Sequence, residues 1–161
     1  MKTTVHPTLI VDSREQIPLV FRTFRSVVGS LTSGDYSFAG GESLFAVERK
    51  SVPDLVASVT GERERFEREL HRLRGFRFAR LLIVGSKAEV EAHRYRSNAT
   101  PKSVLHSLAA FECRYSIPVV WSPTPEEAAS LVEGWAYWTA RELVKAAEAV
   151  TAGMTPEPLS Q

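Results

Sequence analysis

The chain has 161 residues, of which 43% are hydrophobic and 24% charged, and its formal net charge is +1. These proportions are typical of a soluble globular domain with one core. They exclude a membrane-spanning protein, because no apolar run approaches the roughly 20 residues that a span needs. Since no basic-then-apolar leader opens the sequence, we expect an intracellular protein (cytoplasm, nucleoid or nucleus) with no membrane partner. The single cysteine, Cys113, cannot form an internal disulfide, and we expect it to be buried.

The first third of the chain has the pattern of strands. Residues 8–12 (TLIVD) are apolar and rich in β-branched side chains, which predicts a buried strand. Residues 18–31 are ambiguous, and we expect a short helix followed by an edge strand. Residues 31–50 alternate in polarity on either side of Gly40-Gly41, which predicts a β-hairpin.

The rest of the chain alternates helices and strands. Ser51 can cap a helix, with Asp54 in its first turn, and Gly61 should separate it from a second, arginine-rich helix. The further expected elements are a strand at 79–85, a short helix at 86–95, a helix after Thr100, a strand at 117–121 and a long helix after Thr124. This order predicts an α/β fold with a mixed sheet flanked by helices. We expect one domain, residues 1–150, and a flexible tail, residues 151–161.

The hairpin brings acidic residues toward a lysine. Because side chains alternate along a strand, Glu48 and Lys50 share one face and Arg49 lies on the other. Asp12 ends the first strand and Asp35 opens the hairpin, so neighbouring strands would bring both toward Glu48. Three carboxylates suit Mg²⁺, and a metal ion with a lysine suits phosphodiester hydrolysis. Each motif alone fits an ion pair or a turn equally well, and only their joint order favours a reaction centre.

That order resembles the XPF family of structure-specific endonucleases. Its nuclease domain carries GD, a variable gap and then ERK-x3-D, matched here by Gly34-Asp35, Glu48-Arg49-Lys50 and Asp54. The segments IVDSRE, LTSGDY and ERKSVPDLVASV also resemble the family's, and the resemblance extends from about Leu9 to Leu143.

The resemblance implies a restriction-endonuclease-like fold and a nuclease that requires Mg²⁺ or Mn²⁺. It implies that Asp12, Asp35 and Glu48 hold the metal ion and that Lys50 is catalytic, with Glu15 and Arg49 as supporting members of the catalytic set. Arg14 and Asp54 would have structural or DNA-contacting roles. The expected reaction is incision of branched DNA at flaps, forks or junctions, in DNA repair or recombination.

The arginine-rich helix is a second candidate DNA contact. Residues 62–80 contain seven arginines and four glutamates, so the segment either follows phosphates or forms i,i+4 ion pairs in solvent. Arg63 and Arg65 of this segment, together with Arg14, are the predicted DNA-binding residues. The sequence departs from the family at Glu67, which stands where a glutamine is common. Trp135 and Trp138 share an apolar stripe of the final helix, which favours a core or homodimer position over base stacking.

Two other functions fit the same sequence. The chain could be a non-catalytic DNA-binding or partner subunit of a nuclease complex, although its intact acids and lysine argue against this. It could also be a resolvase or a restriction-like nuclease on the same fold.

Overall fold

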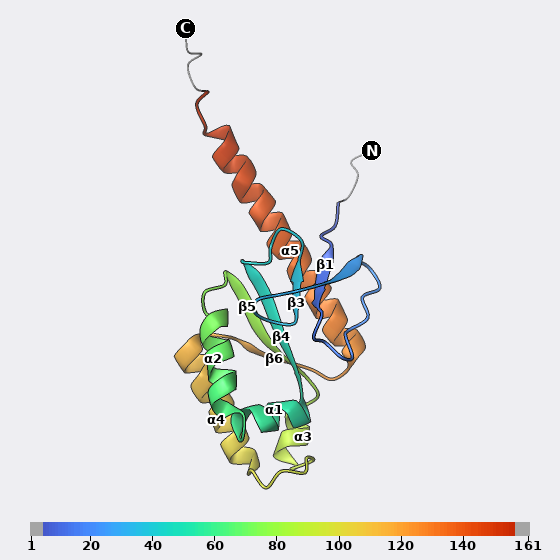
Figure 1. The fold of residues 1–161 in the computed structure, drawn as a ribbon, viewed down its shortest axis with the longest axis vertical. Helices are drawn as coiled ribbons and strands as arrows, with labels where there is room; N and C mark the ends of the chain where they lie inside the picture. Colours follow the sequence, from blue (N-terminus) through green and yellow to red (C-terminus); the bar gives the residue numbers. More distant parts are fainter. Residues whose placement is uncertain (1–4, 157–161) are drawn as a thin grey trace.

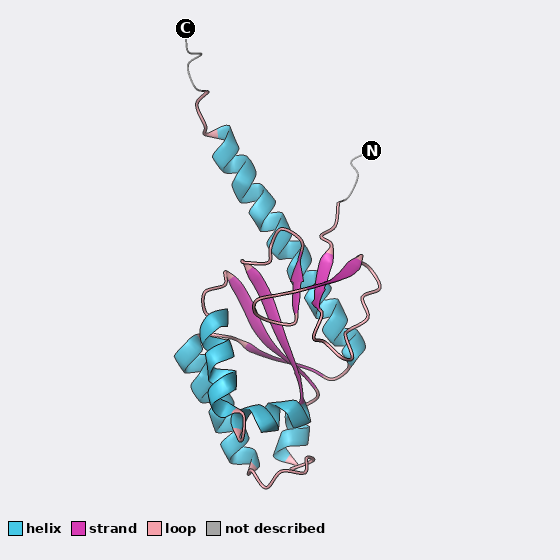
Figure 2. Cartoon of the chain, viewed as in Figure 1, coloured by secondary structure: helices cyan, strands magenta, loops and turns pink. Residues whose placement is uncertain are grey.

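A six-stranded sheet in the order β2-β1-β3-β4-β5-β6 forms the centre of the molecule (Figures 1 and 2). The computed structural model describes residues 5–156. The strands are β1 (Leu9–Asp12), β2 (Ser26–Gly29), β3 (Tyr36–Phe38), β4 (Phe45–Ser51), β5 (Phe78–Val84) and β6 (Val119–Ser122). Strand β3 runs antiparallel to both β1 and β4, whereas the pairs β1–β2, β4–β5 and β5–β6 are parallel. The predicted mixed sheet is therefore confirmed.

Helices cover both faces of this sheet. They are α1 (Val52–Val59), α2 (Arg63–Leu73), α3 (Lys87–Glu91), α4 (Pro101–Tyr115) and α5 (Pro125–Ala152). Apolar side chains of α1, α2, α3 and α4 form one core cluster with β4 and β5, and α5 forms a second cluster on the opposite face. The C-terminal half of α5 extends beyond the sheet (Figure 1). Within residues 5–156, no helix combines the length and the apolar character needed to cross a membrane.

The helix termini follow the capping pattern of the sequence. The hydroxyl of Ser51 accepts the N–H of Asp54 at 3.2 Å, and Thr124 accepts the N–H of Glu127 at the same distance. Each bond satisfies a backbone donor that has no partner within its helix. The first of these caps starts α1 directly after β4, so that the charged end of β4 lies where the chain turns away from the sheet.

The prediction of a short helix in residues 18–31 is wrong. This segment is irregular before β2, because its backbone donors bond to a side chain of α5 instead of to helical carbonyls. Oε2 of Glu133, which is 7% exposed, accepts the N–H of Thr23 at 3.0 Å and of Phe24 at 2.7 Å. Phe21 packs edge-on against Tyr36, with ring centroids 5.6 Å apart. The tertiary contacts of this loop thus replace a local helix.

The structure also bears on Cys113 and on the predicted end of the domain. Cys113 is exposed, not buried, because it lies on the outer side of α4 while Phe111 fills the core. The predicted division at residue 150 falls inside the last turn of α5, which ends at Ala152. Of the predicted tail, residues 157–161 lie outside the described residues.

Candidate active site

Three acidic residues form a row across neighbouring strands of the sheet. Asp12 ends β1, and its backbone N–H donates to the carbonyl of Asp35 at 2.9 Å. Asp35 precedes β3, and its N–H donates to the carbonyl of Val47, the neighbour of Glu48 on β4, at 2.8 Å. The residues that flank this row pack into the cluster with α5, so by strand alternation the three carboxyl groups project toward the other face. We call Asp12, Asp35 and Glu48 the acidic row.

Glu48 is buried beside Asp35, which is half-buried. Glu48 is 8% exposed, and burial together with the charge of Asp35 raises its pKa to about 8. Burial also raises the pKa of Asp35 to about 7, although its Oδ2 accepts the N–H of Arg49 at 2.8 Å. If both groups ionise, nearby positive charge does not fully compensate their negative charge. Either bound protons or a bound cation can provide the missing compensation.

Lys50 provides part of this compensation. Its Nζ lies 3.4 Å from Oε1 of Glu48 and 4.9 Å from the ring centroid of Phe66 on α2. The side chain is only 15% exposed. The ammonium group is therefore fixed between a carboxylate and an aromatic face, beside the acidic row.

Asp12 has direct partners of its own. Its Oδ1 accepts the N–H of Leu31 at 3.0 Å, and its Oδ2 accepts Nε–H of Arg14 at 2.7 Å. Burial acts to raise the pKa of Asp12, but these hydrogen bonds outweigh it and lower the pKa. Among residues 5–156, no group of three or more Asp, Glu, His or Cys side chains is gathered closely enough to hold a metal ion. The predicted ligands lie in a row and do not form a closed cluster.

The chemistry of the acidic row nevertheless fits a divalent cation. Desolvation raises the pKa values of Asp35 and Glu48, with further contributions from the charge of Glu15 on Asp35 and of Asp35 on Glu48. A cation of charge two favours the ionised form of both groups. All three groups supply the oxygen atoms that Mg²⁺ and Mn²⁺ prefer. Arg14, which pairs with Asp12 and donates to the carbonyl of Leu31 at 3.0 Å, is itself 72% exposed, so it is the partner of Asp12 that a bound cation would displace.

Glu15 and Arg49 meet on the opposite face of the sheet. Nε of Arg49 lies 3.4 Å from Oε2 of Glu15. The hydroxyl of Tyr36 donates to the same Glu15 oxygen at 2.6 Å and accepts the N–H of Leu19 at 2.8 Å. This network connects the segment after β1 to β3 and β4 directly behind the acidic row. Tyr36, which is 0% exposed, supports the site and was not among the predicted site residues, because a tyrosine on a strand carries no motif that separates this role from ordinary packing.

Helix α2 brings two further residues to the site. Phe66 contacts Lys50, and the negative charge of Glu69 contributes to the raised pKa of Glu48. Glu67, the residue noted at the glutamine position, lies on another side of α2. It pairs with Arg114 and accepts the hydroxyl of Tyr115 at 3.0 Å, so it connects α2 to α4. The spacing of three residues between Phe66 and Glu69 was the available sequence signal for a shared helix side.

The predicted DNA contacts are distributed unevenly. Nη1 of Arg63 donates to the hydroxyl of Ser107 at 2.8 Å, and its guanidinium covers the ring of Phe111, so it is directed to α4. Arg65 is 70% exposed and lies 3.9 Å from Glu69, on the side of the acidic row. Asp54 is exposed at the start of α1, with its backbone N–H on the capping serine.

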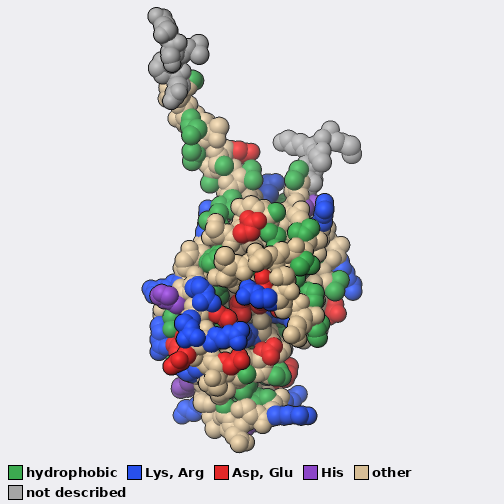
Figure 3. All heavy atoms as spheres, viewed as in Figure 1, with side chains coloured by type: hydrophobic (Ala, Val, Ile, Leu, Met, Phe, Trp, Pro, Cys, Tyr) green, Lys and Arg blue, Asp and Glu red, His purple; other side chains and the backbone are tan. Residues whose placement is uncertain are grey.

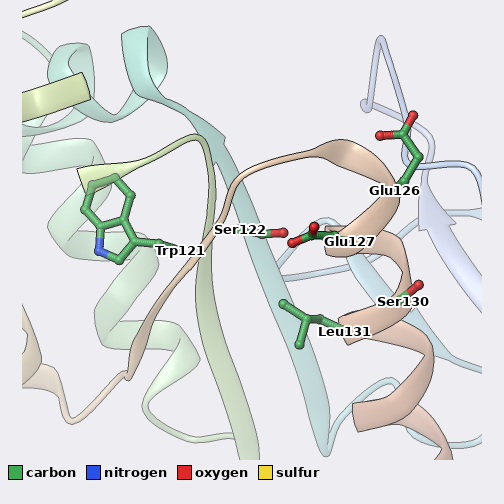
Figure 4. Close-up of a pocket in the computed structure, with 6 residues that line it drawn as sticks. All are labelled: Trp121, Ser122, Glu126, Glu127, Ser130 and Leu131. Atoms are coloured by element: carbon green, nitrogen blue, oxygen red, sulfur yellow. The ribbon is translucent and has the colours of Figure 1, made fainter. Parts of the chain in front are cut away.

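The surface has a hollow that is separate from the acidic row. It has a volume of about 450 Å³ and lies between the edge strand β6 and the first turns of α5. In Figure 4, Glu127 and Leu131 of α5 point toward Ser122 of β6. Strand β5 separates β6 from β4, which carries Glu48 and Lys50, so this hollow is no part of the candidate active site.

Comparison with known proteins agrees with this architecture. The sequence profile of the ERCC4 domain matches residues 11–134, a span that includes every residue of the acidic row. No curated protein matches the chain. Among solved structures, XPF from Aeropyrum pernix is similar, with a TM-score of 0.65 and 23% identity over 88% of this chain and 69% of that one. The same protein in complex with DNA gives a TM-score of 0.66 and 22% identity over 85% of this chain and 66% of that one. At these identities the likeness concerns the fold, which is the restriction-endonuclease-like α/β fold expected from the sequence.

Proposed function

The chain belongs to the ERCC4 domain family, a family of DNA nucleases, and on that basis we propose that it is a metal-dependent endonuclease that hydrolyses phosphodiester bonds in branched DNA. The observation that carries the proposal is the acidic row beside Lys50, in which Asp12 and Glu48 are buried and the pKa values of Asp35 and Glu48 are raised. A structural ion pair needs only one acid for one lysine, so the additional buried acids require another explanation.

Mg²⁺ or Mn²⁺ is the proposed cofactor, and Asp12, Asp35 and Glu48 are the residues that would hold it. Such an ion lowers the pKa of a bound water and stabilises negative charge on a phosphoryl oxygen. The protein's own contribution is to keep the carboxylates in place. The N–H of Arg49 fixes Asp35, and the N–H of Leu31 fixes Asp12.

Lys50 is the proposed catalytic cation. Because Glu48 and Phe66 hold its ammonium group on the face of the acidic row, it can neutralise charge that develops on the phosphate during hydrolysis. Glu15 and Arg49 pair on the other face and would act as positioning residues. Their role is to keep the ends of β1 and β4 in register, without contact with the substrate.

The substrate preference and the partners belong to the same proposal. We expect flap, fork or junction DNA, an intracellular location, and a role in DNA repair or recombination. A homodimer through the C-terminal helices is supported by Trp138, which is 63% exposed on the stripe that continues from Trp135 and Leu131. An exposed tryptophan on a helix stripe is typical of interfaces between chains.

Two observations favour a non-catalytic DNA-binding subunit as a second candidate. Asp12 is paired with Arg14, and no closed ligand cluster is present among residues 5–156. A related nuclease with another substrate, such as a resolvase or a restriction-like enzyme, is the third candidate. These candidates differ in what they cleave, so one substrate panel separates them.

The experiment is cleavage of labelled flap, fork, four-way junction and linear duplex DNA, with Mg²⁺, with Mn²⁺ and with EDTA. The proposal predicts cleavage of branched DNA only when a divalent metal is present. Binding of branched DNA without cleavage under any condition would support the non-catalytic subunit. Cleavage restricted to four-way junctions or to linear duplex would identify the third candidate.

A further inference from the structure

Helix α2 and the residues after it carry arginines of two kinds. Arg63 lies 3.6 Å from Glu67, and Arg65 lies 3.9 Å from Glu69, so both have carboxylate partners. Among the described residues, the later arginines of this segment form no ion pair with an acidic side chain. These are Arg68, Arg72, Arg74 and Arg77. Positive charge without an internal partner is therefore concentrated toward the C-terminal end of α2.

A hollow lies beside two of these arginines. It has a volume of about 420 Å³ and is lined by Glu67, Arg68, His71, Arg72 and Tyr115. Its only acid, Glu67, already pairs with an arginine of α4 and accepts the hydroxyl of Tyr115 at 3.0 Å. The remaining polar lining is cationic or neutral, and such a lining suits an anionic ligand.

The hollow lies on the helix that reaches the acidic row. Phe66 of α2 contacts the ammonium of Lys50, and Arg68 and Arg72 follow it by two and six residues. At 1.5 Å and about 100° per residue, these positions lie about 3 and 9 Å further along the helix axis and about 160° and 120° around it from Phe66. A DNA strand with a phosphate at Lys50 therefore passes around α2, whose diameter with side chains is about 10–12 Å, to reach the hollow. Since one DNA strand carries a phosphate roughly every 3.4 Å along its axis, this path takes about five nucleotides. In Figure 3, Lys and Arg side chains gather over α2, with acidic side chains between them.

We propose that Arg68 and Arg72, with the hollow that extends to Tyr115, bind the phosphate backbone of the substrate DNA within a few nucleotides of the cleaved bond. The inference rests on the proposed nuclease function, which places a DNA phosphate at Lys50. It shifts the main expected phosphate contacts along α2 from Arg63 and Arg65, whose guanidinium groups have carboxylate partners, to arginines that have none.

The test measures binding of flap DNA in EDTA, where no metal-dependent cleavage occurs, as a function of salt. The variant Arg68→Gln/Arg72→Gln removes two exposed charges from the hollow. Its matched control, Arg94→Gln/Arg96→Gln, removes two exposed charges from the loop after α3. Each lost phosphate contact on duplex DNA lowers the slope of log K against log salt by about 0.9. For the Arg68/Arg72 variant, the affinity change between 50 and 200 mM salt should therefore become about tenfold smaller than for the wild type. The control should keep the wild-type slope.

Equal slopes for the wild type and the Arg68/Arg72 variant would overturn the inference, as would an equal loss in both variants. Thermal unfolding of both variants checks that the fold is kept. Since binding is measured without cleavage, this result is separate from the nuclease proposal. A wild type that cleaves no DNA but loses affinity through Arg68→Gln/Arg72→Gln would support the binding surface and refute the nuclease. If the wild type cleaves DNA and the Arg68→Gln/Arg72→Gln variant binds DNA with the wild-type salt dependence, the nuclease proposal is supported and the binding surface is refuted.

Discussion

Replacing Glu48 by glutamine should make the metal-free protein less sensitive to rising pH. Burial and the charge of Asp35 raise the pKa of Glu48 from 4.5 to about 8 in the folded protein. The folded state therefore keeps a proton that the unfolded chain has already released. Stability from this group is fully present below about pH 4.5 and is lost as the pH rises through about 8. Glutamine has no such proton, so the variant should not show this loss.

The magnitude follows from the pKa difference. One pKa unit corresponds to about 1.4 kcal/mol, so the rise from 4.5 to about 8 sets an upper limit of about 4 to 5 kcal/mol. Because the unfolded chain has already released most of this proton at pH 5, only part of that limit falls within the measured range, and we expect roughly 3 to 4 kcal/mol to be lost by the wild type between pH 5 and pH 9. Glu48→Gln also removes a negative charge beside Asp35, which makes ionisation of Asp35 easier. Between pH 5 and pH 9 the variant should therefore lose less than half of the stability that the wild type loses.

The assay is urea unfolding in EDTA, followed by tryptophan fluorescence at several pH values. Glu64→Gln is the matched control, because it makes the same chemical change at an exposed position of α2. Mg²⁺ at pH 9 should restore stability to the wild type and to the control, but not to Glu48→Gln, because a ligand stabilises only the state that binds it. A wild type that becomes more stable between pH 5 and pH 9, or a variant that loses as much as the wild type, would refute the reasoning.

Three further predictions concern other parts of the molecule. Lys50→Met should reduce single-turnover cleavage by about 10² or more while the fold is kept; a rate near that of the wild type would remove Lys50 from the mechanism. Glu133→Ala should destabilise the protein by about 1–3 kcal/mol in urea unfolding, because two backbone N–H groups of the loop before β2 lose their acceptor. The same loss in Glu142→Ala, an exposed change on the same helix, would contradict that explanation. Trp138→Glu should convert a dimer into a monomer in sedimentation velocity, and a wild type that is already monomeric would refute the proposed interface.

The positions of the acidic row could be predicted from the sequence because strand geometry is periodic. Alternation along β4 assigned Glu48 and Lys50 to one face and Arg49 to the other, and the ion pairs of Lys50 with Glu48 and of Arg49 with Glu15 agree with it. Gly40 has a positive φ of 85° in the turn of the hairpin, a conformation that favours glycine, so the pairing of β3 with β4 could also be predicted from the sequence. Local rules were sufficient for the hairpin of β3 and β4, whereas the position of Asp12 also required that β1 pair with β3.

Contacts between distant segments were not predictable in this way. Glu133 determines the course of a loop that lies about one hundred residues earlier, with separations of 109 and 110 residues. The arginines of α2 look alike in the sequence, yet Arg63 is directed to α4 while Arg68 and Arg72 line a hollow. Likewise, the pairing of Asp12 with Arg14 depends on the exact turn after β1, which no periodicity encodes.

The central claim is that the acidic row makes the chain a metal-dependent nuclease. It is tested most directly by single-turnover cleavage of branched DNA by the wild type and by Asp35→Asn. Asparagine keeps an oxygen that can accept the N–H of Arg49 but loses the negative charge. We predict cleavage by the wild type with Mg²⁺ and none with EDTA, and a rate for Asp35→Asn that is lower by about 10² or more with the fold intact. Cleavage by Asp35→Asn at the wild-type rate, or cleavage by the wild type in EDTA, would contradict the claim.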